Sequence, residues 1–289
     1  MPSIDGRDTV SVVILTLNGG SELCRSIEQV LSQRIDSPVE VVLVDSGSSD
    51  GTENLDKQFR LRMVRIPQRS FRFGSARNLA FASSSGRYVA TISQDYVPAN
   101  EDWLAELIKP LEQGADVSLG SAIPPPDRRP FYWETRRFCY TSEGSEFIRK
   151  HGGIGFSCTC LATRRDVWEQ TGFGDDTPMS EDKIFQKRCF EKGFSNVIHA
   201  EKALGYHGHQ YGSSSVFRRC ENEGFGWKWV GERYGFGSML IDLVSPSAWA
   251  KLGLGIVTGK VRSAAEFLFP VIRPIAVYRG NRHGTEYRR

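Results

Sequence analysis

The stretch that decides the fold opens with VSVVILTLN (Val10–Asn18) and returns to VEVVLVDSGSSDGT (Val39–Thr52). A nearly continuous β-branched run, as in the first segment, is typical of a strand that is covered on both faces. Between the two segments, apolar residues recur at helical spacing: Leu23, Ile27, Val30 and Leu31. The stretch therefore predicts strand, helix and strand, with a polar turn at the end of each strand.

The same alternation continues along the chain and predicts a mostly parallel sheet. Further strands are expected at Met63–Ile66, Tyr88–Ser93, Val117–Ile123 and Ser157–Thr163, with a strand pair through Ser195–His207. Helices are expected from Thr52, at Ser75–Ser84, Trp103–Gln113 and Ser180–Lys192, from about Ser214, and through the last forty residues. Pro124–Lys150 is predicted to be an insertion or an active-site loop.

Composition is that of an ordinary globular chain, with 39% hydrophobic and 25% charged residues among 289. Six cysteines without C-x-x-C spacing favour reduced thiols and a cytoplasmic location. The polar start lacks the features of a signal peptide, and no run of eighteen apolar residues predicts a membrane span. Pro246–Arg289 holds eight Lys or Arg against two Glu. Either this tail is a solvated surface, or it makes peripheral contact with a membrane.

Polar residues close three of the predicted strands, where ligands of open α/β sheets bind. The closures are Thr16-Leu17-Asn18, Asp45-Ser46-Gly47-Ser48 and Ser93-Gln94-Asp95. Each is also compatible with a plain turn. Asp95 is well placed to hold a divalent cation against a diphosphate, and His207 and His209 follow a later strand and offer imidazoles suited to Mn²⁺ or Mg²⁺. A His-x-His pair alone is more often an ordinary surface or core feature.

Two acidic residues, Glu181 and Asp182, follow Ser180 at the start of a predicted helix. Helix capping explains them, since negative charge is favoured in a first turn. Alternatively, one of the carboxylates accepts a proton from an attacking hydroxyl group. The pattern leaves both interpretations open.

Taken in order, these segments resemble glycosyltransferase family 2 on the GT-A fold, over roughly residues 11 to 224. The resemblance lies in VVILTLN (Val12–Asn18), VDSGSSDGT (Val44–Thr52), GSARN (Gly74–Asn78) and Gln94-Asp95. It implies an α/β, GT-A-type nucleotide-sugar-binding fold with a mostly parallel twisted sheet flanked by helices, plus a helical C-terminal extension. It also implies an inverting transfer of a sugar from a nucleoside diphosphate to a hydroxyl group, dependent on Mg²⁺ or Mn²⁺.

The resemblance also implies roles for individual residues. The donor-binding set is Thr16, Leu17, Asn18, Asp45, Ser46, Gly47, Arg77, Gln94 and Asp95. The metal set is Asp95, His207 and His209, with one histidine sufficing, and the catalytic set is Asp182 with Glu181 beside it. Gln94 departs from the family where many members carry a second Asp. The Gln-Asp pair is instead similar to a bacterial rhamnosyltransferase-like branch, as is the segment from Phe71 to Ala80.

The expected division places a GT-A domain at residues 1–235, with a donor half at about 10–123 and an acceptor half at about 150–235. A basic, amphipathic helical extension follows at 236–289. The expected partners are a dTDP- or UDP-linked sugar and a saccharide or lipid-linked saccharide acceptor, with no nucleic acid. An oligomer is left open. Two alternatives remain: a non-catalytic partner subunit with the same fold, and a sugar nucleotidyltransferase, for which the segment after the first strand is a poor match.

Overall fold

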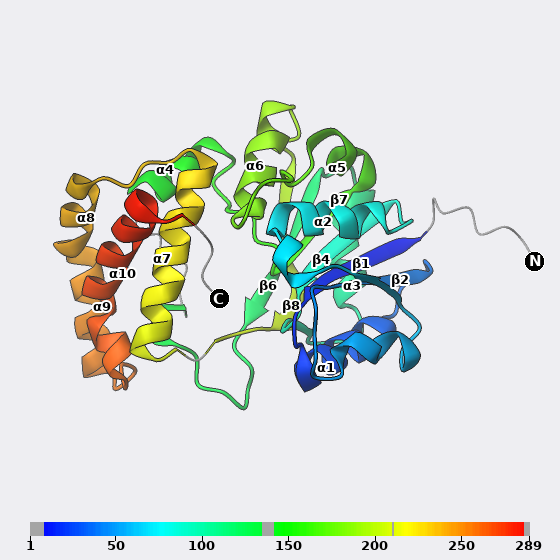
Figure 1. Ribbon diagram of the computed structural model, residues 1–289, viewed down its shortest axis with the longest axis horizontal. Coiled ribbons are helices and arrows are strands. Elements are labelled where there is room, and N and C mark those ends of the chain that lie inside the picture. Colours follow the sequence, from blue (N-terminus) through cyan, green and yellow to red (C-terminus); the bar gives the residue numbers. More distant parts are fainter. Residues whose placement is uncertain (1–8, 135–141, 210, 286–289) are drawn as a thin grey trace, which may run out of the picture. The chain divides into compact units, whose positions relative to one another are not determined.

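A mixed eight-stranded sheet and a group of helices make up the chain in the computed structural model, which describes residues 9–134, 142–209 and 211–285 (Figure 1). Contacts divide the chain into two units. The sheet unit comprises Met1–Ile123, Gly155–Thr177 and Glu181–His207, and the helical unit comprises Pro124–Ile154, Pro178–Ser180 and Gly208–Arg289. The domain boundaries expected from the sequence stay a prediction.

Four parallel strands form one half of the sheet: β1 (Val10–Thr16), β2 (Val39–Asp45), β3 (Arg62–Arg65) and β4 (Tyr88–Ser93). Every residue of β1 is buried, as the unbroken apolar run predicts. The register pairs Thr16 with Asp45 and Leu15 with Ser93. The predicted polar closures therefore meet at one edge of the sheet, which we call the polar edge.

The other half of the sheet is mixed. β7 (Cys160–Arg164) runs antiparallel to β4 and to β6 (Val117–Ile123), and the short β5 (Val97–Pro98) runs antiparallel to β8. The prediction of a strand pair at residues 195–207 is wrong, because β8 is one continuous strand, Val197–Tyr206, parallel to β6. An irregularity in its register between Leu119 and Ser121 of β6 explains why its sequence pattern looks broken.

Helices cover both faces of the sheet. α1 (Gly20–Leu31) and α3 (Trp103–Glu112) pack their apolar stripes against one face, and α2 (Phe73–Ala82) lies across the other (Figure 1). The helix expected from Thr52 is only a 3₁₀ segment, Thr52–Lys57, because β3 begins too soon after it for a longer helix. Two further helices are α5 (Arg165–Thr171), which the sequence did not reveal, and α6 (Glu181–Glu191).

The helical unit contains α4 (Ser142–Lys150), α7 (Ser213–Val230), α8 (Phe236–Leu243), α9 (Pro246–Val257) and α10 (Ala264–His283). α7 and α10 cross closely at two glycines: a Cβ on Gly224 would lie 2.0 Å from the Val277 carbonyl oxygen, and one on Gly280 would lie 1.8 Å from that of Glu221. A capping box between Ser263 and Glu266 starts α10. The predicted helical C-terminal extension is confirmed.

Candidate active site

The loops that follow β1 and β2 are tied to one another. The backbone N–H and the Oγ of Ser46 both donate to the Thr16 carbonyl at 3.0 Å. The Asn18 backbone N–H donates to Ser48 Oγ at 2.8 Å, and Asn18 Oδ1 accepts from the Ser49 N–H at 2.9 Å. Asn18 and Gly47 have positive φ angles of 51° and 98°, which turn both loops sharply.

Asp45 lies buried at the end of β2, where Ser48 holds its carboxylate. Ser48 donates to Asp45 Oδ1 through its hydroxyl group at 2.5 Å and through its backbone N–H at 3.1 Å. The weaker backbone contact of 3.3 Å leaves Oδ2 the less engaged oxygen. A carboxylate fixed in this way can accept a hydrogen bond from an N–H group of a nucleobase.

Gln94 joins the end of β4 to the loop after β1. Its Oε1 accepts from Thr16 Oγ1 at 2.8 Å and from the Leu17 backbone N–H at 3.0 Å. An aspartate here would bring a charge and a shorter side chain to a position that the structure uses for a neutral amide. Gln94 therefore fixes the geometry of the polar edge.

Asp95 and His207 come together although 112 positions separate them in the sequence. His207 Nε2 lies 3.4 Å from Asp95 Oδ1, and both side chains are partly exposed. The backbone N–H of His207 donates to the Ile123 carbonyl at 2.9 Å, which fixes the residue just beyond β8. Neighbouring ligand atoms on an octahedral ion lie roughly 3 Å apart, given ligand distances of about 2.1 Å. The pair therefore fits one divalent cation.

His209 belongs to the helical unit, two positions after His207. It therefore remains a predicted ligand. Its backbone N–H lies 3.5 Å from Glu134 Oε2 within that unit.

Tyr96 positions the turn that carries Asp95, and sequence reasoning missed it. The buried Tyr96 hydroxyl group accepts from Trp103 Nε1 at 2.9 Å and donates to the Ser121 carbonyl at 3.1 Å. Its backbone carbonyl accepts from Ser26 Oγ at 2.7 Å. A Cβ on Gly205 would lie 2.1 Å from the Tyr96 ring, so only glycine fits there. No local sequence pattern links Tyr96 to Gly205, because 109 positions separate them.

Glu181 and Arg77 form a buried ion pair in the sheet unit. Arg77 donates through Nη2 to Glu181 Oε1 at 2.9 Å and through Nη1 to Thr91 Oγ1 at 2.5 Å. Their side chains are only 8% and 5% exposed. Burial raises the pKa of Glu181, the Arg77 charge opposes the rise, and the neighbouring Asp182 carboxylate adds to it. Arg77 thus connects α2, β4 and the start of α6.

Asp182 differs from its neighbour in being accessible. Its side chain is 21% exposed, compared with 8% for Glu181. Lys183 contacts it twice, through the backbone N–H at 2.8 Å and through Nζ at 3.3 Å. Lys183 Nζ also donates to the Phe156 carbonyl, which ties the lysine to the segment before β7. Of the two acids, Asp182 is the one with a carboxylate that is accessible to solvent.

Comparison with protein families gives a match to the family described as Glycosyl transferase family 2, over residues 11–172, which is more than half of the chain. The O-antigen chain rhamnosyltransferase WbaN of Salmonella anatum is 26% identical over 223 residues, covering 74% of this chain and 70% of that protein. The O-antigen chain rhamnosyltransferase RfbN of Salmonella typhimurium is 26% identical over 225 residues, covering 74% and 71%.

Solved structures show the same fold. The mannosyltransferase PcManGT from Pyrobaculum calidifontis, in complex with GDP-Man and Mn²⁺, has a TM-score of 0.61 at 18% identity and covers 97% of this chain and 88% of its own. Glucosyl-3-phosphoglycerate synthase from Mycobacterium tuberculosis, with Mn²⁺ and UDP, has a TM-score of 0.53 at 19% identity, covering 71% and 73%. The GT-A fold predicted from the sequence is confirmed.

Proposed function

We propose that this chain, which belongs to glycosyltransferase family 2, transfers a sugar from a nucleoside-diphosphate sugar to a hydroxyl group, with inversion at the anomeric carbon and dependence on a divalent cation. The observation that carries the proposal is the meeting of Asp95 and His207 at 3.4 Å. Two distant segments bring a carboxylate and an imidazole together beyond the carboxyl ends of parallel strands, which is where ligands of open α/β sheets bind.

The donor nucleoside would lie against the loops after β1 and β2. Asp45, held by Ser48, is the partner for the base, and Thr16, Leu17 and Asn18 line the pocket with Ser46 and Gly47. Gln94 keeps the loop after β1 in place. Arg77 would support the site from the interior of the sheet unit. Its guanidinium is buried and already donates hydrogen bonds to Glu181 and Thr91.

Asp95 and His207 would hold Mn²⁺ or Mg²⁺, with His209 as a further ligand. The sequence places His209 two residues beyond His207, within reach of the same ion. When bound, the cation neutralises charge that develops on the departing diphosphate.

Asp182 would be the general base. In the step it assists, the acceptor oxygen bonds to the anomeric carbon as the bond from that carbon to the diphosphate oxygen breaks. The electron pair leaves with the nucleoside diphosphate, and the acceptor proton passes to the Asp182 carboxylate. The exposure of Asp182 supports this role, whereas Glu181 is buried in an ion pair with Arg77.

A deoxyhexose such as rhamnose is the proposed sugar, carried by dTDP or UDP. Its support is the similarity to two O-antigen chain rhamnosyltransferases together with the Gln94-Asp95 pair. A saccharide or lipid-linked saccharide is the proposed acceptor, in the synthesis of a cell-surface polysaccharide. We place this reaction in the cytoplasm, at the inner face of the cytoplasmic membrane.

A thermal-shift comparison of nucleoside diphosphates, each with and without Mn²⁺, tests this function. We expect dTDP or UDP near 100 times its Kd to add about 2.7 kcal/mol of stability in the presence of Mn²⁺, or roughly 5–10 °C in Tm. Asp95→Ala should lose the part of this stabilisation that depends on Mn²⁺. Asp36→Ala, an exposed change ahead of β2, should keep it. No response to any nucleoside diphosphate would contradict the proposal.

A further inference from the structure

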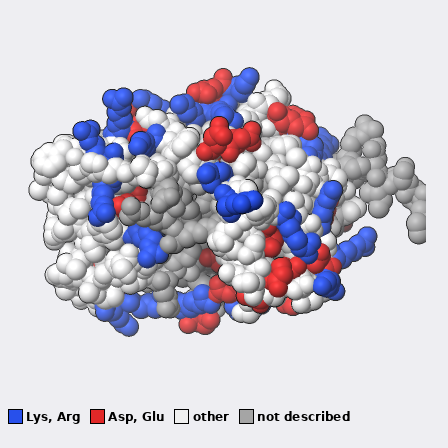
Figure 2. Space-filling view, in the orientation of Figure 1, with Lys and Arg blue, Asp and Glu red and all other residues white. Residues whose placement is uncertain are grey.

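The outward side of α8 and α9 carries large apolar side chains and no exposed charge. Eight residues between Phe236 and Val257 are at least 45% exposed, and we call them the apolar face: Phe236, Leu240, Ile241, Val244, Trp249, Leu254, Ile256 and Val257. The surface over these helices is mostly white in Figure 2, with Lys and Arg near its margins. Apolar patches of this extent mark sites of contact with a partner or a membrane.

The two charged residues within this segment are turned inward. Asp242 is 5% exposed and accepts a hydrogen bond from the Tyr234 hydroxyl group at 2.8 Å. The Lys251 ammonium lies 5.1 Å from the centre of the Trp133 ring and 5.6 Å from that of Tyr132. Both charges are turned into the interior of the helical unit, so the outward side is left without a charged side chain.

By length and composition, Phe236–Val257 is the one candidate for a membrane span among the described residues. It has 22 residues, and 22% of its 18-residue apolar window is buried. The sequence, which contains no run of eighteen apolar residues, predicts no span. The chain, however, breaks between α8, which has 8 residues, and α9, which has 12. At 1.5 Å per residue the longer helix reaches only about 18 Å, compared with about 30 Å for the hydrocarbon core of a bilayer. The segment is therefore suited to lying on a membrane.

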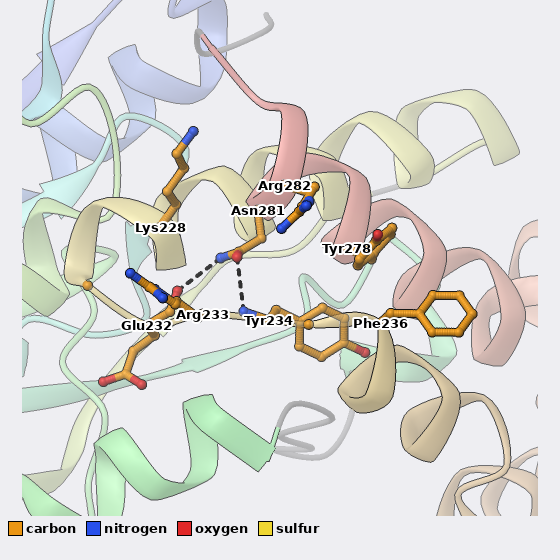
Figure 3. Close-up of a pocket in the computed structure, with 10 residues that line it drawn as sticks. Lys228, Glu232, Arg233, Tyr234, Phe236, Tyr278, Asn281 and Arg282 are labelled. Carbon is orange, nitrogen blue, oxygen red and sulfur yellow. Dashed lines mark hydrogen bonds between the residues drawn. The ribbon is translucent and has the colours of Figure 1, made fainter.

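A cavity of about 710 Å³ adjoins the apolar face through Phe236, which belongs to both (Figure 3). Three cations line the cavity: Lys228, Arg233 and Arg282. Within the described part of the chain, the side chains of Arg233 and Arg282 form no ion pair, while Lys228 donates to the Gly284 carbonyl at 3.2 Å.

Asn281 fixes the loop that carries Arg233. Its Nδ2 donates to the Glu232 carbonyl at 3.0 Å and its Oδ1 accepts from the Tyr234 N–H at 2.9 Å, as the dashed lines in Figure 3 show. The Glu232 carboxylate, the one acidic group among the lining residues, points away from Asn281 and Arg282 in this view. The cavity therefore offers positive charge beside an apolar surface.

We propose that the apolar face lies on a membrane that contains anionic lipids, with Arg233 and Arg282 holding the phosphate of a lipid headgroup. The inference deepens the membrane location proposed above, but it needs no assumption about the transfer reaction. Exposed Lys260 and Arg262 follow the face directly and add to the attraction. An apolar face with cations at its margin matches an anionic bilayer in both hydrophobicity and charge.

Sedimentation with vesicles, in the absence of donor and acceptor, tests this inference separately from catalysis. The protein should bind vesicles of phosphatidylcholine mixed with phosphatidylglycerol far better than phosphatidylcholine alone, and salt should weaken the binding. Arg233→Glu with Arg282→Glu should reduce binding by at least roughly 25-fold, since each lost cation contributes about fivefold near an anionic surface and each new carboxylate is repelled by it. Arg60→Glu, an exposed change in the sheet unit, should have little effect.

The apolar contribution is tested with Ile241→Glu and Val257→Glu together, at positions 64% and 86% exposed. This variant should lose at least tenfold in vesicle binding, whereas Ile198→Glu, at 43% exposure in β8, should not. Circular dichroism would verify that each variant remains folded. Unaltered binding by the double variant would overturn the inference. A second result would also overturn the inference: the wild type does not bind vesicles but forms a dimer in light scattering, and Ile241→Glu with Val257→Glu abolishes the dimer. In that case a second copy of the chain would cover the apolar face.

Discussion

The polar edge of the sheet unit and the apolar face of the helical unit use charged side chains in opposite ways. At the edge, Asp45 ends β2 and Asp95 follows β4, and Asp182 lies in the first turn of α6 within the same unit. Along α8 and α9, Asp242 and Lys251 are drawn into the interior. The sheet unit thus places carboxylates at the ends of its strands and helices, whereas the apolar face carries no charged side chain.

This difference implies that catalysis and docking can be damaged independently. Variants at the edge should alter turnover or the stability of the sheet unit without changing vesicle binding. Variants of the apolar face, or of the start of α10, should act on docking or on local stability. An edge variant that changes vesicle binding, or a face variant that lowers turnover in solution, would break the separation.

The largest effect is expected for Asp182→Asn. Loss of a positioned general base typically costs 10²–10⁴ in rate, and the amide keeps the shape of the side chain. We expect kcat to fall by that factor while the thermal shift produced by the nucleoside diphosphate is retained. Steady-state release of nucleoside diphosphate would measure this.

Asp176→Asn is the matched control, since that carboxylate is exposed six positions earlier. Its kcat should stay at the level of the wild type. Full turnover by Asp182→Asn would show that Asp182 is not the general base. Glu181 would then be the acid to test next.

The sequence predicted much of the polar edge because parallel strands bring their carboxyl ends together. Short polar motifs after apolar runs were sufficient to place Thr16, Asp45 and Asp95 at one edge. The contacts of Arg77 and Gln94 could not be predicted in this way. A buried arginine that pairs with an acid 104 positions later, and an amide that ties two loops, depend on tertiary packing that no local pattern encodes.

The helical unit was harder to predict for a different reason. Counting charges made the C-terminal segment look like a basic amphipathic tail, yet Arg273 pairs with Glu223 and Arg279 pairs with Glu221. These ion pairs neutralise part of the positive charge of the segment. Helical periodicity in a small unit also does not show which stripe is turned inward, so the apolar face appears only in the folded structure.

A second effect is expected at the ion pair behind the polar edge. Arg77→Met leaves Glu181 buried without its charged partner, which should destabilise the protein by about 3–5 kcal/mol. The combination with Glu181→Leu should recover most of that loss, because an apolar pair of similar size replaces both charges. Urea unfolding would measure both variants, with Arg60→Met as the exposed control. A single variant as stable as the wild type would show that the pair does not organise the edge.

The smallest of these effects concerns Glu266, at the start of α10, and depends on pH. Burial alone would raise its pKa, but hydrogen bonds from Arg129 and from the backbone N–H groups of Arg262 and Tyr132 outweigh burial and lower the pKa. A depressed pKa in the folded state contributes stability above the unfolded value, near 4.5, and this contribution is lost as the pH falls through the folded value.

Glu266→Gln should therefore cost roughly 2 kcal/mol at neutral pH, as expected for hydrogen bonds to a charged group. The difference from the wild type should shrink as the pH falls below the ordinary range of a glutamate. Urea unfolding at several pH values would measure it, with the exposed Glu112→Gln as a control. Because Glu266 anchors Tyr132 and Arg129 in the helical unit, its loss should also weaken vesicle binding. A loss of stability that is constant across pH would mean that packing, rather than the carboxylate charge, holds the start of α10.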